Sequence, residues 1–237
     1  MKRRALLIGN TRGLAGVQAD MQKTRAFLGS RVGGDWLPSE ISELRNPSRR
    51  ELLGHIQLLK SESVDYAFVL FSGHGGHAHQ TVLELNANGE TINESELWNI
   101  APRQITIYDC CRALIGEQIV KSFTMESVTD SFVRRDDIRA RYEARIMQAI
   151  PQQVRLYACS VTQSAYDLGK GAIYLGHLLS SAATIAPGLS FKTVESAHEQ
   201  ACPLTAATAA REGYQQNPDA VLPKCLTQQQ LILAIRP

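Results

Sequence analysis

Two short stretches decide the fold of this chain: residues 68–76 read FVLFSGHGG and residues 105–113 read ITIYDCCRA. In each stretch a short β-type run ends at once in small or polar residues. Such a run is typical of a strand that is buried on both faces of a mostly parallel sheet. Active sites collect at the carboxyl ends of these strands, so we expect His74 and the Cys110-Cys111 pair at one edge of the sheet.

Short strands and amphipathic helices alternate along the chain, which predicts an α/β sandwich of three layers. A polar Asn86–Gly89 segment predicts a hairpin turn between strands at 81–85 and 90–93. Asn46 and Pro47 are typical of an N-cap and a first helical residue. The further strands are expected at 4–8, 65–71, 104–108, 154–158 and 231–235, and the helices at 16–28, after 46–47, at 137–149 and at 171–183.

The composition is that of an ordinary globular protein. The chain has 237 residues, 44% of them hydrophobic and 20% charged, with a net charge of +2. We therefore expect one domain over residues 1–237 and no nucleic-acid partner. Its five cysteines form no disulfide spacing, and the apolar run after Met1–Arg4 is too short for a signal peptide. No run is long enough for a membrane span, so we expect a cytoplasmic protein with no membrane partner.

A histidine and a thiol at neighbouring strand ends can support nucleophilic catalysis. A nucleophilic thiol needs a nearby base, and an imidazole supplies one near neutral pH. Glycines beside the histidine allow main-chain N–H groups to face a developing oxyanion. Each half also has a plainer interpretation, because a lone histidine is usually structural and a Cys-Cys pair is usually inert packing. His74, His77 and His79 cluster without a C-x-x-C pair, so we expect no metal site.

These motifs resemble a known family. Residues 72–75 and 109–112 look like the two catalytic motifs of the caspase–metacaspase clan of cysteine proteases. Residues 14–20 resemble the first loop and helix of those proteases, and residues 157–165 resemble the segment that opens their small subunit. The terminal 231–235 strand also fits, so the resemblance covers most of the chain. One departure is the His–Cys separation, 111 − 74 = 37 residues, against roughly 50 in caspases.

The resemblance implies a caspase-like three-layer sandwich and a cysteine endopeptidase (EC 3.4.22.-) with a His74–Cys111 dyad. It selects Cys111 as the nucleophile, although Cys110 at the same strand end stays an alternative. It also implies an oxyanion hole formed by the main-chain N–H groups of Gly75 and Cys111. It implies no third catalytic residue.

The resemblance also predicts specificity. Caspases that cleave after aspartate carry an arginine two residues before the glycine of the first loop, where this chain has Leu14. Metacaspases cleave after arginine or lysine by means of two acidic residues, which correspond to Asp20 and Asp109. Two carboxylates facing a guanidinium give charge-assisted hydrogen bonds. We therefore expect cleavage after arginine, with lysine second, unless Asp20 is simply a helix-start acid.

Residues 116–151 are polar and arginine-rich, and we interpret them as a linker between a large-subunit-like part (1–115) and a small-subunit-like part (152–237). Related proteases are cut between these parts, so we expect a zymogen activated by itself or by an upstream protease. The alternative is a solvated helix whose charges pair. The candidate processing sites are Arg134, Arg135, Arg139, Arg141 and Arg145.

Two rival functions remain open at this stage. One is a catalytically silent caspase-like scaffold that binds partners, and the other is a cysteine hydrolase or transferase acting on a small thioester or amide. Calcium activates many metacaspases, but no Asp-rich calcium loop is present, so no cofactor is expected. The expected partners are protein substrates. By resemblance alone, we expect a monomer that serves a prokaryotic stress, cell-death or antiviral pathway.

Overall fold

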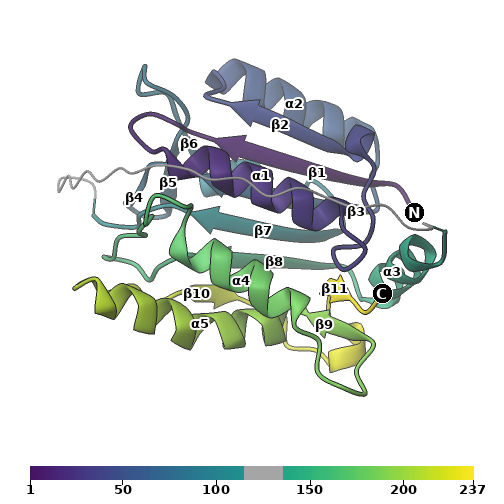
Figure 1. Ribbon diagram of the computed structural model, residues 1–237. Coiled ribbons are helices and arrows are strands. Elements are labelled where there is room, and N and C mark those ends of the chain that lie inside the picture. Colours follow the sequence, from purple (N-terminus) through teal and green to yellow (C-terminus); the bar gives the residue numbers. More distant parts are fainter. Residues whose placement is uncertain (115–135) are drawn as a thin grey trace.

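The computed structural model describes residues 1–114 and 136–237, and its centre is a six-stranded sheet (Figure 1). The strand order is β10-β8-β7-β3-β1-β2. All neighbours in it are parallel except the edge strand β10, which runs antiparallel to β8. The strands are β1 (Arg3–Gly9), β2 (Ile41–Arg45), β3 (Tyr66–Ser72), β7 (Arg103–Asp109), β8 (Gln152–Tyr157) and β10 (Asp219–Val221).

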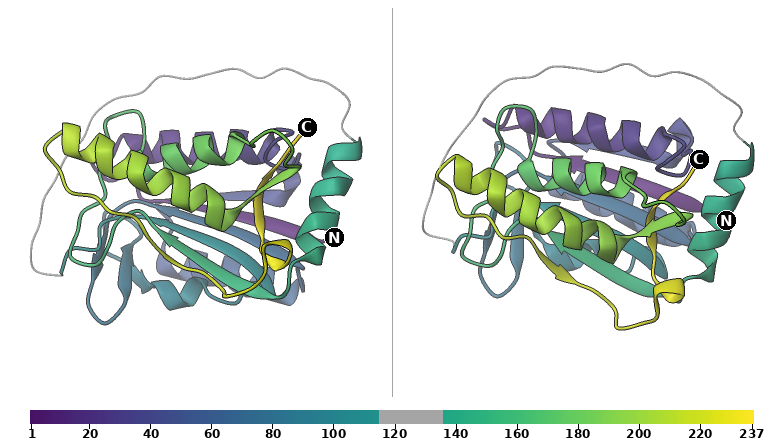
Figure 2. Two further views of the ribbon diagram at one scale, coloured as in Figure 1. Left: turned by 90° about the horizontal axis from the view of Figure 1, so that it is seen from below. Right: turned by 60° about the horizontal axis from the view of Figure 1, so that its bottom comes forward.

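Helices cover both faces of the sheet, which confirms the predicted three-layer α/β sandwich (Figure 2). On one face lie α1 (Gly16–Gly29), α4 (Ile173–Ala183) and α5 (Val194–Arg211). On the other lies α2 (Arg49–Ser61). Helix α3 (Asp136–Gln148) lies beside the chain termini, at the amino ends of the parallel strands (Figure 1).

Alternate residues of each strand enter two separate cores, as the period of a β-strand requires. Leu7 of β1 packs with Phe68 of β3 under α1, α4 and α5, whereas Leu6 and Val69 pack with Leu52 of α2. All four strand residues are at most 1% exposed. The central strands are therefore apolar throughout, and this explains the uninterrupted β-type runs in the sequence.

Beyond the carboxyl end of β3 lies a small antiparallel sheet. It consists of β4 (Gly75–His77), β5 (Thr81–Glu84) and β6 (Thr91–Asn93). The polar turn between β5 and β6 contains Gly89 at φ 73°, as the predicted hairpin requires. The 3₁₀ helices are η1 (Pro38–Glu40), η2 (Glu94–Leu97) and η3 (Thr227–Gln229).

The terminal strand forms as predicted from its apolar run, but it lies outside the central sheet. Strand β11 (Ile232–Ile235) forms and is buried, but it pairs with β9 (Phe191–Thr193) in a separate two-stranded sheet. The position beside β8 is taken by β10, a three-residue strand whose burial pattern is mostly exposed. Period and hydrophobicity predict that a strand forms, but its partner is decided by the chain path.

Other local predictions were wrong or incomplete. The N-cap of α2 is Ser48, whose Oγ accepts a hydrogen bond from Glu51 N at 3.2 Å. Asn46 instead adopts φ 49°, and its side-chain oxygen accepts from Thr11 N. Strand β2 and helix α5 were not predicted, because β2 is only partly buried and α5 carries an internal Pro203.

Candidate active site

The loops after β3 and β7 are joined by main-chain hydrogen bonds. Gly73 N donates to Asp109 O at 3.1 Å, and His77 N donates to Ala113 O at 2.8 Å. These bonds place Gly75 opposite Cys111. A Cβ atom added to Gly75 would lie 2.7 Å from Cys110 Sγ and 3.0 Å from Cys111 O. Only glycine fits at this contact, so the sequence brings the histidine loop directly against the cysteine loop.

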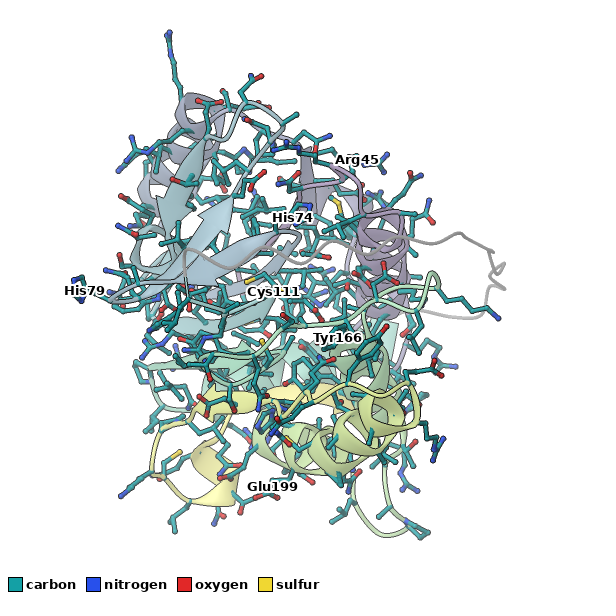
Figure 3. All side chains as sticks on the ribbon, turned by 90° about the vertical axis from the view of Figure 1, so that its left-hand side faces the viewer. Arg45, His74, His79, Cys111, Tyr166 and Glu199 are labelled. Carbon is teal, nitrogen blue, oxygen red and sulfur yellow. The ribbon has the colours of Figure 1, made fainter. Side chains whose placement is uncertain are left out.

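His74 is oriented by the main chain of another loop. Its Nε2 lies 2.6 Å from the carbonyl oxygen of Arg12. A carbonyl oxygen only accepts hydrogen bonds, so Nε2 carries a proton, and in the neutral ring Nδ1 has the lone pair. Figure 3 views the carboxyl ends of the strands, with His74 and Cys111 near the centre and His79 far out at the edge.

The two vicinal thiols differ in access. Cys110 is 2% exposed, and burial raises the pKa of its thiol well above the usual range. Cys111 is partly exposed, and its Sγ donates to Ala165 O at 3.6 Å. Burial also raises the pKa of Cys111, while a hydrogen bond from Ser164 acts in the opposite direction. Within the described residues, no hydrogen bond joins the Cys111 thiol to the His74 ring.

A cavity of about 70 Å³ opens beside this pair. Its walls come from three places in the chain: the start of α1, the two loops after β3 and β7, and residues 164–172 before α4. The lining residues are Leu14, Val17, Asp20, Ser72, Gly73, His74, Asp109, Cys110, Cys111, Ser164, Ala165, Tyr166, Asp167 and Ala172.

Both carboxylates predicted for substrate recognition line this cavity. Asp20 is 2% exposed and accepts hydrogen bonds from Ser72 Oγ and Ala172 N, each at 2.8 Å. Burial raises the pKa of Asp20 to about 6. Asp109 is 4% exposed and accepts from Leu175 N at 3.2 Å. Burial, and then the charge of Asp20, raise the pKa of Asp109 well above its ordinary value.

Sequence reasoning missed three groups of the site. The Arg12 carbonyl belongs to the main chain, so no residue type signals it. Ser164 lies in the 157–165 segment, which was matched only as a resemblance, and Asp167 lies just beyond that segment.

The candidate processing arginines divide into two groups. Arg134 and Arg135 lie outside the described residues. The others lie within α3, where Arg139 pairs with Glu143 at 3.1 Å and Arg145 is 7% exposed. A protease binds its substrate in an extended form, so cleavage in α3 would require that helix to unwind.

Within residues 1–114 and 136–237, no three His, Cys, Asp or Glu side chains are grouped to hold a metal ion. In the same part of the chain, no helix combines the length and apolar character needed to cross a bilayer.

Both the sequence and the fold are similar to those of known proteins. A sequence model described as the caspase domain, of peptidase family C14, matches residues 2–221. Caspase-1 from Spodoptera frugiperda superimposes with a TM-score of 0.59 at 10% identity, over 92% of this chain and 87% of its own. Protein GSU0716 from Geobacter sulfurreducens gives 0.58 at 14% identity, over 100% and 98%. At these identities the two structures show a shared fold alone. No curated protein matches.

Proposed function

Because this chain belongs to the caspase domain family of cysteine peptidases, we propose that it is an endopeptidase with a His74–Cys111 dyad that cleaves proteins after arginine, and after lysine second. One observation carries the proposal: the imidazole, the partly exposed thiol and two buried carboxylates line the same cavity. The family supplies the class of chemistry, and the cavity supplies the residues.

The orientation of His74 supports its role as the base. Because Nε2 is held by the Arg12 carbonyl, Nδ1 is the nitrogen available to Cys111. Burial raises the pKa of Cys111, which favours the protonated thiol, and a base is then needed to remove the proton during attack. The Arg12 carbonyl then acts as the orienting third group of the site.

The reaction proceeds in two stages. The Cys111 proton moves to His74 Nδ1 as Sγ forms a bond to the substrate carbonyl carbon. The carbonyl oxygen gains negative charge and is stabilised by the N–H groups of Gly75 and Cys111. When the C–N bond breaks, His74 returns the proton to the leaving amine. Water then hydrolyses the thioester and regenerates the thiol.

Two features support this oxyanion hole. The close contact of Gly75 with Cys110 and Cys111 brings the two main-chain segments together. Cys111 lies outside the regular strands, and the described main-chain hydrogen bonds beyond helices and strands give its N–H group no acceptor. A donor without a partner is suited to receive the substrate oxygen.

The cavity supports a basic residue before the cleaved bond. Asp20 and Asp109 are buried carboxylates, and a guanidinium can bind both through charge-assisted hydrogen bonds. Burial of unpaired negative charge is costly, which is why both pKa values are raised. A cationic side chain would relieve that cost, whereas an aspartate side chain would increase it.

The proposal includes activation by cleavage of the linker at one of its arginines. Since Arg139, Arg141 and Arg145 lie within helix α3, the cut is assigned to Arg134 or Arg135. Incubation of wild type and Cys111→Ala, followed by sequencing of any fragments, separates self-cleavage from cleavage by another protease. A role in a stress, cell-death or antiviral pathway is supported by the resemblance alone.

An active-site label tests the proposed function. An arginyl chloromethyl ketone should alkylate wild type at Cys111, as mapped by mass spectrometry, and an aspartyl ketone should not. The Cys111→Ala variant should lose the label, while Cys110→Ala should keep it. Labelling at Cys110 would reverse the assignment of the pair. A folded protein that takes up neither ketone, before or after linker cleavage, would favour the silent scaffold.

A further inference from the structure

A third carboxylate lines the cavity beside Asp20 and Asp109. Asp167 lies in the segment before α4 that forms the outer wall. Neighbouring Tyr166, which Figure 3 places beside the dyad, stacks on Tyr214 with ring centres 4.1 Å apart. This wall is tied to the deeper acids, since Ala172 N donates to Asp20 and Leu175 N donates to Asp109. The segment from Asp167 to Leu175 therefore contains one of the three acids and donates a hydrogen bond to each of the other two.

The carboxylate of Asp167 is fixed by its own loop. Its Oδ1 accepts hydrogen bonds from Gly169 N at 2.7 Å and Gly171 N at 3.1 Å. Within the described residues, no hydrogen bond occupies Oδ2. One oxygen therefore holds the loop, and the other has no hydrogen-bond partner among these residues.

Two glycines make room for these acids. A Cβ atom added to Gly16 would lie 1.6 Å from Asp167 Oδ2, a separation that no side chain tolerates. Gly171 has φ 103°, and a Cβ atom there would lie 2.5 Å from Asp20 Oδ1. The first turn of α1 can approach the outer wall only because residue 16 lacks a side chain.

The charges of the three acids act on one another. Asp167 contributes to the raised pKa of both Asp20 and Asp109, after burial and other causes. Lys23 acts on Asp20 in the opposite direction, and its Nζ contacts the carbonyl oxygen of Lys170 at the wall. Asp109 Oδ1 has no hydrogen-bond partner within the described residues, although the side chain is 4% exposed. The cavity therefore offers unpaired carboxylate oxygens on two sides.

We propose that Asp167 is a specificity-determining residue that makes this pocket prefer arginine over lysine. The inference rests on the proposed function and deepens it. A guanidinium is planar, spreads its charge and presents five N–H donors along its edges, so it can bind the deep acids and Asp167 at once. An ammonium concentrates three donors at one point and satisfies the deep acids only. Loss of Asp167 should therefore penalise arginine more than lysine.

Binding to a catalytically inactive protein tests the inference apart from chemistry. In a Cys111→Ala background, calorimetry would measure the affinity of three otherwise identical peptide amides ending in arginine, lysine or norleucine. The parent should prefer arginine. Asp167→Asn keeps an oxygen for the two glycine N–H groups but removes the charge. It should weaken arginine binding about tenfold and lysine binding about twofold or less.

Two further variants control the result. Asp65→Asn removes a carboxylate at the amino end of β3, distant from the cavity, and should leave all three affinities unchanged. Gly16→Ala displaces the Asp167 carboxylate without changing charge and should reproduce the loss for arginine. In the active protein, Asp167→Asn should raise KM for arginine substrates more than it lowers kcat.

The binding results distinguish the role of Asp167 from the preference of the pocket for basic side chains. An arginine preference that survives Asp167→Asn unchanged would overturn the inference and leave the basic pocket of the proposed function intact. Equal binding of all three peptides by the parent would overturn both.

Discussion

At the scale of single residues, the buried acids of the cavity lower the stability of the folded protein. Asp20 is held almost fully buried, without a cationic side chain hydrogen-bonded to it, and the pKa of its carboxyl is raised from 3.8 to about 6. A carboxyl that binds its proton more tightly in the folded state destabilises that state above its unfolded pKa. The penalty is absent near pH 4, grows as the pH rises to about 6 and is constant above that.

Asp20→Asn should therefore stabilise the free protein at pH 7.5, by about 3 kcal/mol at most. The advantage should shrink as the pH falls from about 6 to about 4, because wild-type Asp20 becomes protonated. Urea unfolding at several pH values measures this difference. The same variant should lose cleavage after arginine. A stability difference that does not change with pH would contradict the burial penalty.

Some residues of the cavity could be predicted from the sequence, and others could not. The positions of His74 and Cys111 at one edge of the sheet could be predicted, because each follows a buried strand at once and parallel strands bring such ends together. The role of the Arg12 carbonyl could not be predicted, since every residue has a carbonyl and only the path of the loop brings this one to His74. The position of Asp167 at the cavity could not be predicted, because it depends on a close contact with Gly16, which is 151 positions away in the sequence.

At the scale of elements, patterns predicted which segments fold but not all of their partners. The central strands were identified because burial on both faces leaves an apolar run. The pairing of β11 with β9 was not predicted, because β9 is three residues long and carries no periodic signal. Helix α5 escaped because Pro203 in its interior and many small residues weaken the helical pattern.

Helix α2 lies on the face of the sheet opposite α1. Substitutions in α2 therefore test local stability without touching the helix that lines the cavity. Ser48→Ala removes the side chain that caps it and should cost about 1 kcal/mol. Gly54 is an exposed helical glycine with open space around its Cα, so Gly54→Ala should stabilise by about 0.5–1 kcal/mol. Denaturant unfolding of both variants measures the effects, and kcat/KM should stay unchanged in each.

At the scale of the whole molecule, the two parts on either side of residues 115–135 form one structure. Strand β8 pairs along its length with β7, across that segment. Helix α3 is bound to the first part through Arg139, which contacts Glu40, and Glu40 also contacts the fully buried Arg3. The first part supplies His74 and Cys111, and the second supplies the outer wall of the cavity.

A single cut between residues 115 and 135 should therefore leave the two parts associated. A recognition sequence for a site-specific protease, placed in that segment, allows the cut to be made at will. Size-exclusion chromatography should show one species of unchanged size, while a denaturing gel shows two chains. Separation of the two chains in native buffer would contradict the shared sheet.

The hydrogen bond between Ala172 and Asp20 spans 152 positions of the chain. During translation the ribosome releases the amino-terminal part first, so His74 and Cys111 emerge while the outer wall of the pocket is still unmade. A nascent chain at that stage contains Asp20 but lacks Ala172, whose N–H group binds its carboxylate. The cavity can therefore be completed only when nearly three quarters of the polypeptide has been made.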